Sequence, residues 1–132
     1  MQDSKKKVLL VDDDIDLLYQ NSILLKQNGF EVITAENQKQ AEELIKSIKP
    51  DIVVTDLMME ELDAGFTLAH HIKQVDDNIP IIIVTGVAQE TGMRFFSGTE
   101  EEKGWTKADT ILSKPIRFEQ LLQEIKKLLA ID

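Results

Sequence analysis

Ile52-Val53-Val54-Thr55-Asp56 is the stretch that decides the fold, because it is an apolar run that ends in a carboxylate. Two further apolar runs end in polar residues, Val8–Val11 before three aspartates and Ile81–Val84 before Thr85. Continuous runs of Val, Ile and Leu are typical of strands that are covered on both faces, as in a parallel sheet. A carboxylate has no packing reason to end such a strand, so these strand ends indicate a functional site.

Five strands are expected from these runs and from two shorter ones. They are Lys7–Val11, Glu31–Ala35, Ile52–Asp56, Ile81–Thr85 and Thr110–Ser113. Apolar residues at helical spacing predict helices between the strands and after the last one. The first spans Asp14–Asn28 and is expected to stop before Gly29. The second begins at Asn37, which forms a capping-box variant with Gln40, and ends before Pro50. The others span Gly65–Gln74 and the segment from Phe118 to Leu129. The glycines of residues 87–107 predict a broken helix or a loop in that segment.

The alternation of strands and helices predicts the α/β class, with a parallel sheet covered by helices on both faces. For five strands in a chain of this length we expect a flavodoxin-like, doubly wound sandwich with strand order 2-1-3-4-5. Ligands of such sheets bind outside the carboxyl ends of the strands, where the strand order reverses. Asp12, Asp13 and Asp56 fall at that point, between the first and third strands.

Length and composition exclude several classes of function. The 132 residues fit a single domain, 1–132, which is either a whole protein or a piece excised from a longer one. Without cysteine there are no disulfides and no thiolate zinc sites. A net charge of −9 argues against direct binding of nucleic acid. No apolar stretch approaches the roughly 20 residues of a membrane span, and a cytoplasmic location is expected.

Other polar groups are expected at the same edge of the sheet. Thr85 ends the fourth strand, and Lys114 follows the fifth. Carboxylates, a hydroxyl and an ammonium group together indicate a site for a phosphoryl group and a divalent cation. Several carboxylates in one place repel each other, and a cation relieves that repulsion.

The acid pair Asp12-Asp13, then Asp56, Thr85 and Lys114-Pro115, each at the end of a strand, resemble the receiver domain of two-component response regulators. The resemblance covers essentially the whole chain. It implies that Asp56 accepts a phosphoryl group from the phosphohistidine of a sensor histidine kinase or phosphotransfer protein. It also implies that Thr85 donates its hydroxyl to the phosphoryl oxygen and that Lys114 pairs with Asp56 or with that oxygen.

The resemblance implies a metal site as well. Asp12 and Asp13 hold Mg²⁺, with Asp13 the more direct ligand, together with Asp56 and the backbone carbonyl of Met58. The following acids, Asp14 and Asp16, have a simpler role, since acids before a helix cap it and favour its positive end.

Several positions depart from the family pattern. Ile111 stands where the family has an aromatic residue that turns inward when the threonine moves. The loop after the third strand lacks the usual proline and carries one extra residue, and Asp63 in it is expected to cap a helix. The stretch from Thr85 to Lys114 is longer than usual, which alters the signalling face of the fourth helix, fifth strand and fifth helix. The partner bound there is unknown.

Two further expectations concern individual side chains. Met58 and Val87 are apolar where the family influences how water reaches the acyl phosphate, so slow self-dephosphorylation is expected. His70 and His71 are adjacent in a helix and diverge by about 100°, so they make a poor metal pair and are expected to be at the surface or half-buried. The aromatic residues between the fourth and fifth strands are assigned to core packing: Phe95, Phe96 and Trp105.

Two alternative functions stay open. A degenerate receiver would bind its partners without phosphorylation, and the altered loop and Ile111 favour it. A phosphohydrolase with an aspartyl-phosphate intermediate is disfavoured, because haloacid-dehalogenase-type enzymes carry a second aspartate where this chain has Met58. A receiver only assists its own modification, so we do not expect a turnover enzyme.

Overall fold

The computed structural model describes residues 5–56, 64–85, 109–113 and 116–131. It contains a five-stranded parallel sheet in the order β2-β1-β3-β4-β5, as predicted. The strands have the predicted bounds: β1 Lys7–Val11, β2 Glu31–Ala35, β3 Ile52–Asp56, β4 Ile81–Thr85 and β5 Thr110–Ser113. The helices of the described residues are α1 Ile15–Gln27, α2 Gln38–Ser47, α3 Ala64–Val75 and α6 Phe118–Leu129.

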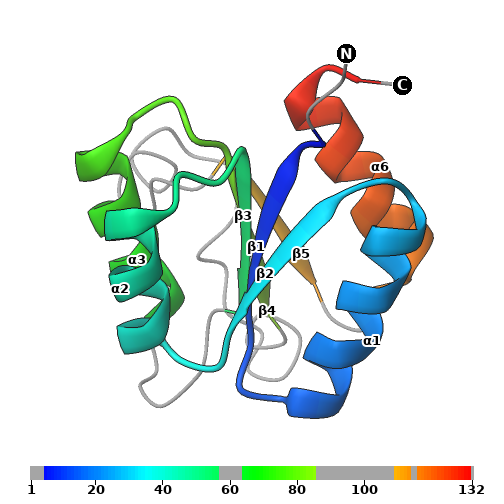
Figure 1. The fold of residues 1–132 in the computed structure, drawn as a ribbon, viewed down its shortest axis with the longest axis horizontal. Helices are drawn as coiled ribbons and strands as arrows, with labels where there is room; N and C mark the ends of the chain where they lie inside the picture. The colour runs from blue at the N-terminus through cyan, green and yellow to red at the C-terminus, as the bar shows by residue number, and fades with distance from the viewer. Residues whose placement is uncertain (1–4, 57–63, 86–108, 114–115, 132) are drawn as a thin grey trace.

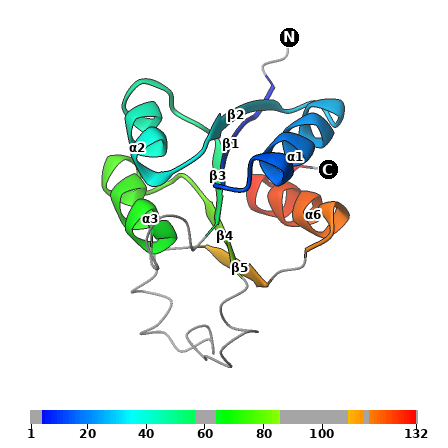
Figure 2. The same ribbon diagram turned by 90° about the horizontal axis from the view of Figure 1, so that it is seen from below.

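The sheet lies between two layers of helices (Figures 1 and 2). Helices α2 and α3 cover one face, and α1 and α6 cover the other. The strands feed both layers by alternation, since Leu9 and Val53 belong to the core cluster on the α2 and α3 side, while Leu10 and Val54 belong to the opposite cluster. Both faces are therefore apolar, which explains why the central strands are uninterrupted runs of Val, Ile and Leu.

The register of the sheet brings the strand ends together. Val11 of β1 pairs with Thr55, Asp56 pairs with Val84, and Thr85 pairs with Ser113. Because the strands are parallel, these residues lie at one edge of the sheet. Figure 1 shows that the start of β1 and the end of α6 lie at the opposite end of the molecule.

The helix ends follow the local chemistry of the sequence. Asp14 is the N-cap of α1, and its carboxylate accepts a 3.2 Å hydrogen bond from the backbone N–H of Leu17. Asp16 lies in the first turn of α1 and does not cap it. After α1 the chain turns at Gly29, whose φ of +92° favours glycine. The predicted cap of Asp14 and the predicted stop before Gly29 are confirmed.

Helix α2 begins with a variant of the predicted capping box. Asn37 accepts a 2.9 Å hydrogen bond from the backbone N–H of Gln40. The Gln40 side chain reaches back to the N–H of Glu36, at 2.8 Å, one residue before the N-cap. The reciprocal bonds therefore enclose one residue more than the standard motif.

Ile111 is partly buried and packs against the core cluster on the α2 and α3 side. It fills part of that core from the edge strand β5. Four residues with predicted roles in the connecting segments lie outside the described residues: Asp63, Phe95, Phe96 and Trp105.

Candidate functional site

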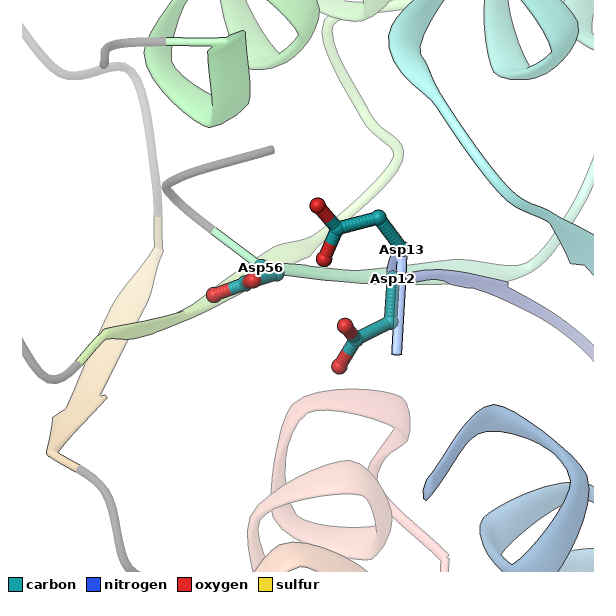
Figure 3. A group of neighbouring side chains, drawn as sticks. All are labelled: Asp12, Asp13 and Asp56. Carbon is teal, nitrogen blue, oxygen red and sulfur yellow. The ribbon is translucent and has the colours of Figure 1, made fainter. Parts of the chain in front are cut away.

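Three carboxylates gather at the carboxyl edge of the sheet. Figure 3 shows Asp12 and Asp13 just past β1 and Asp56 at the end of β3. One carboxylate oxygen of each lies within 4.8 Å of the others. Within the described residues, this is the one group of three or more acidic or histidine side chains that could hold a metal ion. The structure thus brings together the three acids that the sequence predicted at the switch point.

The three acids differ in their exposure to solvent. Asp56 is buried, with 8% of its surface exposed, whereas Asp12 is half-buried and Asp13 is exposed. The backbone carbonyl of Asp56 accepts a 3.0 Å hydrogen bond from the buried hydroxyl of Thr55. Asp56 is therefore held in the sheet by its place in β3 and by this bond.

Asp12 is positioned by the turn between β1 and α1. Its backbone N–H donates to the carbonyl of Ala35 on β2 at 3.1 Å. Its Oδ1 accepts a 2.9 Å hydrogen bond from the N–H of Asp14. One carboxylate oxygen of Asp12 thus shapes the turn, while Asp13 projects from the same turn toward solvent.

The carboxylate group fits a magnesium ion. At Mg–O distances of 2.0–2.1 Å, neighbouring oxygens of an octahedron lie about 3 Å apart and opposite ones about 4.2 Å apart. The oxygens of Asp12, Asp13 and Asp56 lie within 4.8 Å, so small side-chain movements would bring them to that geometry. If each of the three acids supplies one oxygen, the remaining positions of the octahedron stay open to other ligands, and Mg²⁺ usually keeps several waters there.

Thr85 lies beside this group at the end of β4. It is 1% exposed, and it directly follows Val84, the residue that pairs with Asp56. On its other side it pairs with Ser113 of β5. The remaining predicted site residues, Met58 and Lys114, lie outside the described residues, as do Val87 and Pro115.

A second titratable cluster lies away from this edge, between α2 and α3. His71 Nδ1 is 2.7 Å from Glu42 Oε2, and Gln38 donates to the same carboxylate. Burial raises the pKa of Glu42, but the hydrogen bonds from Gln38 and His71 and the charges of His71 and Lys46 lower it by more. The pKa of Glu42 is therefore below its ordinary value of 4.5.

The two histidines are neighbours on α3. Their ring centroids are 6.3 Å apart, His70 is exposed, and His71 is half-buried against Glu42. The predicted surface or half-buried placement of both is confirmed.

Just past α3, the hydrogen bonds that Asp76 accepts from Lys49 Nζ and from the N–H of Asn78 lower the pKa of Asp76 as well.

We expect Glu42→Gln to reduce the free energy of unfolding near pH 6 and to have progressively less effect below pH 4.5. Since the pKa of Glu42 is lower in the folded state than in the unfolded state, its carboxylate stabilises the fold above the unfolded value. That stabilisation is lost as the pH falls through the folded pKa. Urea denaturation of both proteins at several pH values between about 3 and about 6 measures the difference.

The matched control is Glu43→Gln, which removes the same charge from an exposed position on the same helix. An effect of Glu42→Gln that stayed constant over the whole pH range would contradict the assignment of the lowered pKa to the ionised pair.

The structure also reveals contacts that the sequence analysis did not assign. The carboxylate of Asp109, just before β5, accepts a hydrogen bond from the backbone N–H of Ile81 at 2.8 Å and pairs with Lys73 at 3.0 Å. An acid directly before a strand was the available signal, but its partner on β4 is not visible in the sequence.

On α1, three large apolar side chains are exposed, Ile15, Tyr19 and Ile23, with 51%, 68% and 39% of their surfaces accessible. They form one stripe at a spacing of four residues that begins beside the carboxylate group. The opposite face of α1 buries Leu18 and Leu25.

No helix of the described residues is long and apolar enough to cross a membrane.

The family model of the response regulator receiver domain matches residues 8–126. Protein PilH of Pseudomonas aeruginosa is 33% identical over 129 residues, which cover 94% of this chain and 98% of PilH. Chemotaxis protein CheY of Bacillus subtilis is 32% identical and covers 93% of this chain and 97% of CheY.

Longer relatives and solved structures match as well. Response regulator MprA of Mycolicibacterium vanbaalenii is 32% identical over 93% of this chain, but the chain spans only 50% of its length. A two-component response regulator from Clostridium difficile superposes with a TM-score of 0.80 at 25% identity, covering 96% of this chain and 97% of that one. Response regulator TrrA of Thermotoga maritima, in complex with Mg²⁺ and BeF, superposes with a TM-score of 0.75 at 25% identity over 93% of this chain and 98% of that one.

Proposed function

The chain belongs to the response regulator receiver domain family, and from that membership we propose that it accepts a phosphoryl group on Asp56 and changes its affinity for a partner in response. One observation carries the proposal. Asp56 ends a central strand, is 8% exposed, and has carboxylate oxygens of Asp12 and Asp13 within 4.8 Å. Receiver domains are signalling domains rather than turnover enzymes.

Asp56 is the nucleophile in this proposal. A carboxylate oxygen attacks the phosphorus of a donor phosphohistidine in line, the new P–O bond forms as the P–N bond breaks, and the electron pair stays on the donor imidazole. The products are an acyl phosphate and a neutral histidine after protonation. Because Asp56 is only 8% exposed, little water reaches it.

Mg²⁺ would be held by Asp12, Asp13 and Asp56, with the backbone carbonyl of Met58 as a further ligand. When bound, it supplies positive charge to the oxygens of the transferring phosphoryl group. The complex of the similar regulator TrrA with Mg²⁺ and BeF supports a magnesium ion in this chain as well. The nucleophile, Asp56, and the other carboxylate ligands, Asp12 and Asp13, already lie together before the donor arrives.

Thr85 and Lys114 complete the proposed site. The Thr85 hydroxyl lies one residue past the β4 partner of Asp56, so it is near enough to turn toward a phosphoryl oxygen on Asp56. Lys114 follows Ser113, which pairs with Thr85, and its ammonium would balance the added charge. The movement of Thr85 toward the modified Asp56 is the proposed start of the switch, a shift between two populated states.

The donor is proposed to be a sensor histidine kinase or a phosphotransfer protein, which would place the domain in the cytoplasm. The output partner is proposed to bind the signalling face of the fourth helix, fifth strand and fifth helix. In this proposal the chain makes no direct contact with nucleic acid. A net charge of −9 is consistent with that, since phosphate backbones select for basic surfaces.

Incubation with Mg²⁺ and acetyl phosphate, a small phosphoryl donor, tests the function. The mass of the intact protein should rise by one phosphoryl group. Sustained release of inorganic phosphate over many turnovers would favour the phosphohydrolase instead. A protein that takes up no phosphoryl group and shows no spectral response to beryllofluoride would be a degenerate receiver. This second candidate is favoured by the departures from the family sequence pattern after β3 and by the aliphatic Ile111.

We expect the acyl phosphate to decay slowly. Met58 and Val87 follow Asp56 and Thr85 by two positions, and apolar side chains cannot orient an attacking water. Positioned polar groups typically accelerate such steps by 10²–10⁴-fold, so Met58→Asn should speed the decay by roughly tenfold or more. Loss of the phosphoryl mass with time after removal of the donor measures the rate, with Met59→Asn as the matched control. A half-life of seconds in the unaltered protein would contradict the expectation.

A further inference from the structure

One face of α1 carries a stripe of exposed apolar side chains, which are Ile15, Tyr19 and Ile23. Tyr19, in the middle of the stripe, leaves 68% of its surface accessible. Single exposed apolar residues are common, but three on successive turns form a continuous stripe about 12 Å long. Figure 2 shows α1 and α6 side by side in one layer on the sheet. Because the stripe stays exposed, neither the sheet nor α6 covers it, and it is available to another apolar surface.

Two charged side chains flank this stripe near its opposite ends. Asp16 lies in the first turn of α1 and Lys26 in its last turn, and both are exposed. At 3.6 residues per turn, Lys26 lies within about 20° of Tyr19 around the helix, and Asp16 within about 60°. Within the part of the chain that the structure describes, neither takes part in an ion pair. The same face of α1 therefore carries a negative end, an apolar middle and a positive end.

This order of charges is complementary to itself when the helix is reversed. If a second copy of α1 runs antiparallel and crosses at the level of Asn21, Asp16 comes level with Lys26 of the second copy. In the same arrangement Tyr19 comes level with Ile23 of the second copy. The twofold symmetry makes each of these contacts twice. Helices that cross at about 20° stay in contact over several turns, so both charge pairs can form together.

We propose that α1 binds α1 of a second copy of this chain in this antiparallel arrangement. One helix face offers less than the roughly 800 Å² per partner of a stable interface, so the dimer is weak and forms at high protein concentration. Exposed ion pairs add little affinity, and their part is to select the antiparallel direction. The net charge of −9 on each copy opposes association, but about 0.15 M salt screens charges that are farther apart than about 8 Å.

The dimer covers surface beside the carboxylate group. Helix α1 begins after its N-cap, Asp14, which directly follows Asp12 and Asp13. In the antiparallel arrangement Asp14 is level with Asn28 of the second copy. A protein donor needs a larger free surface around Asp56 than acetyl phosphate does, so the dimer should slow transfer from a protein more than transfer from the small donor. This consequence rests on the proposed function, whereas the dimer itself does not.

Sedimentation equilibrium tests the dimer on the unmodified protein, without Mg²⁺ or a phosphoryl donor, at about 0.15 M salt. The average mass should rise above that of the monomer between about 20 μM and about 1 mM protein. Tyr19→Ser should raise the dissociation constant roughly tenfold, because it removes the largest side chain of the stripe. Val75→Ser is the matched control, since Val75 is 61% exposed on α3 outside the stripe, and it should leave the dissociation constant unchanged.

Charge reversal tests the direction of the two helices. Asp16→Lys and Lys26→Asp each turn both attractive pairs into repulsive ones, so each should raise the dissociation constant roughly fivefold or more. Asp16→Lys should do so although it lowers the net negative charge of the chain. Glu43→Lys makes the same change of charge at an exposed position on α2 and should not weaken the dimer. An equal mixture of Asp16→Lys and Lys26→Asp restores both pairs across the interface and should form heterodimers about as readily as the unaltered protein dimerises.

A protein that stays monomeric up to about 1 mM would overturn the proposal, and the stripe would then be left for a different partner. Association that neither charge reversal weakens would also overturn it, as would a mixture of the two variants that fails to associate, because both results exclude the antiparallel pairing. If the unmodified protein dimerises as described but takes up no phosphoryl group, the proposed function fails and the dimer stands.

Discussion

Asp56→Asn is expected to abolish the uptake of a phosphoryl group while leaving the protein folded. The carboxamide has nearly the same shape as the carboxylate, so the packing around this buried position changes little. Its oxygen carries no charge and its nitrogen is a donor, so it does not attack phosphorus. Intact mass after incubation with acetyl phosphate and Mg²⁺ should show no adduct, against one phosphoryl group on the unaltered protein.

Asp16→Asn is the matched control for this variant. Asp16 is an exposed acid in the first turn of α1, close in sequence to the carboxylate group but not part of it. The Asp16→Asn protein should therefore accept a phosphoryl group on Asp56 at a nearly normal rate. An adduct of normal stoichiometry on Asp56→Asn would mean that another residue is the acceptor.

Asp13→Asn should weaken Mg²⁺ binding by at least about tenfold. A unit charge about 4 Å from another contributes about 4 kcal/mol at an effective dielectric constant near 20, part of which returning water offsets. Asp13 is the exposed member of the group, so its substitution disturbs the fold least. Isothermal titration with MgCl₂, or the shift of backbone amide resonances with Mg²⁺ concentration, measures the affinity.

Although Asp13→Asn weakens Mg²⁺ binding, it should stabilise the protein when no Mg²⁺ is present. Three carboxylates within 4.8 Å repel each other, so removing one charge should raise the Tm without Mg²⁺. Saturating Mg²⁺ should raise the Tm of the unaltered protein. At a Mg²⁺ concentration of 100 times Kd, the free energy of unfolding should increase by about 2.7 kcal/mol. In Asp13→Asn that rise should shrink, whereas Asp14→Asn should keep the Mg²⁺-dependent rise. Equal Mg²⁺ affinities in Asp13→Asn and Asp14→Asn would contradict the assignment of Asp13 as a ligand.

The strands could be predicted from the sequence because their burial is two-sided. A run such as Ile81–Val84 meets apolar helices on both faces, so each residue of it must be apolar, and the run stops where the site begins. The parallel sheet followed from the alternation of strands and helices, and the strand order from the flavodoxin-like arrangement expected for five strands in a chain of this length. The meeting of Asp12, Asp13 and Asp56 followed from parallel pairing, since parallel strands end at the same edge.

Long-range side-chain contacts could not be predicted in the same way. Asp109 and Ile81 are 28 positions apart, and nothing in the local pattern of either indicates the bond between them. The pair of Glu42 with His71 joins two helices whose facing sides depend on how both pack on the sheet. Turns allowed partial prediction: the side chain of Gln40 turns back as expected but binds Glu36 rather than Asn37.

The most direct test of the central claim is to locate the phosphoryl group. After phosphorylation with acetyl phosphate and Mg²⁺, borohydride reduces an aspartyl phosphate to homoserine, and peptide mass spectrometry identifies the reduced residue. We predict a single reduced position, Asp56, and none in samples prepared without Mg²⁺. Reduction at another acid, or a phosphoryl group that resists borohydride, would contradict the account.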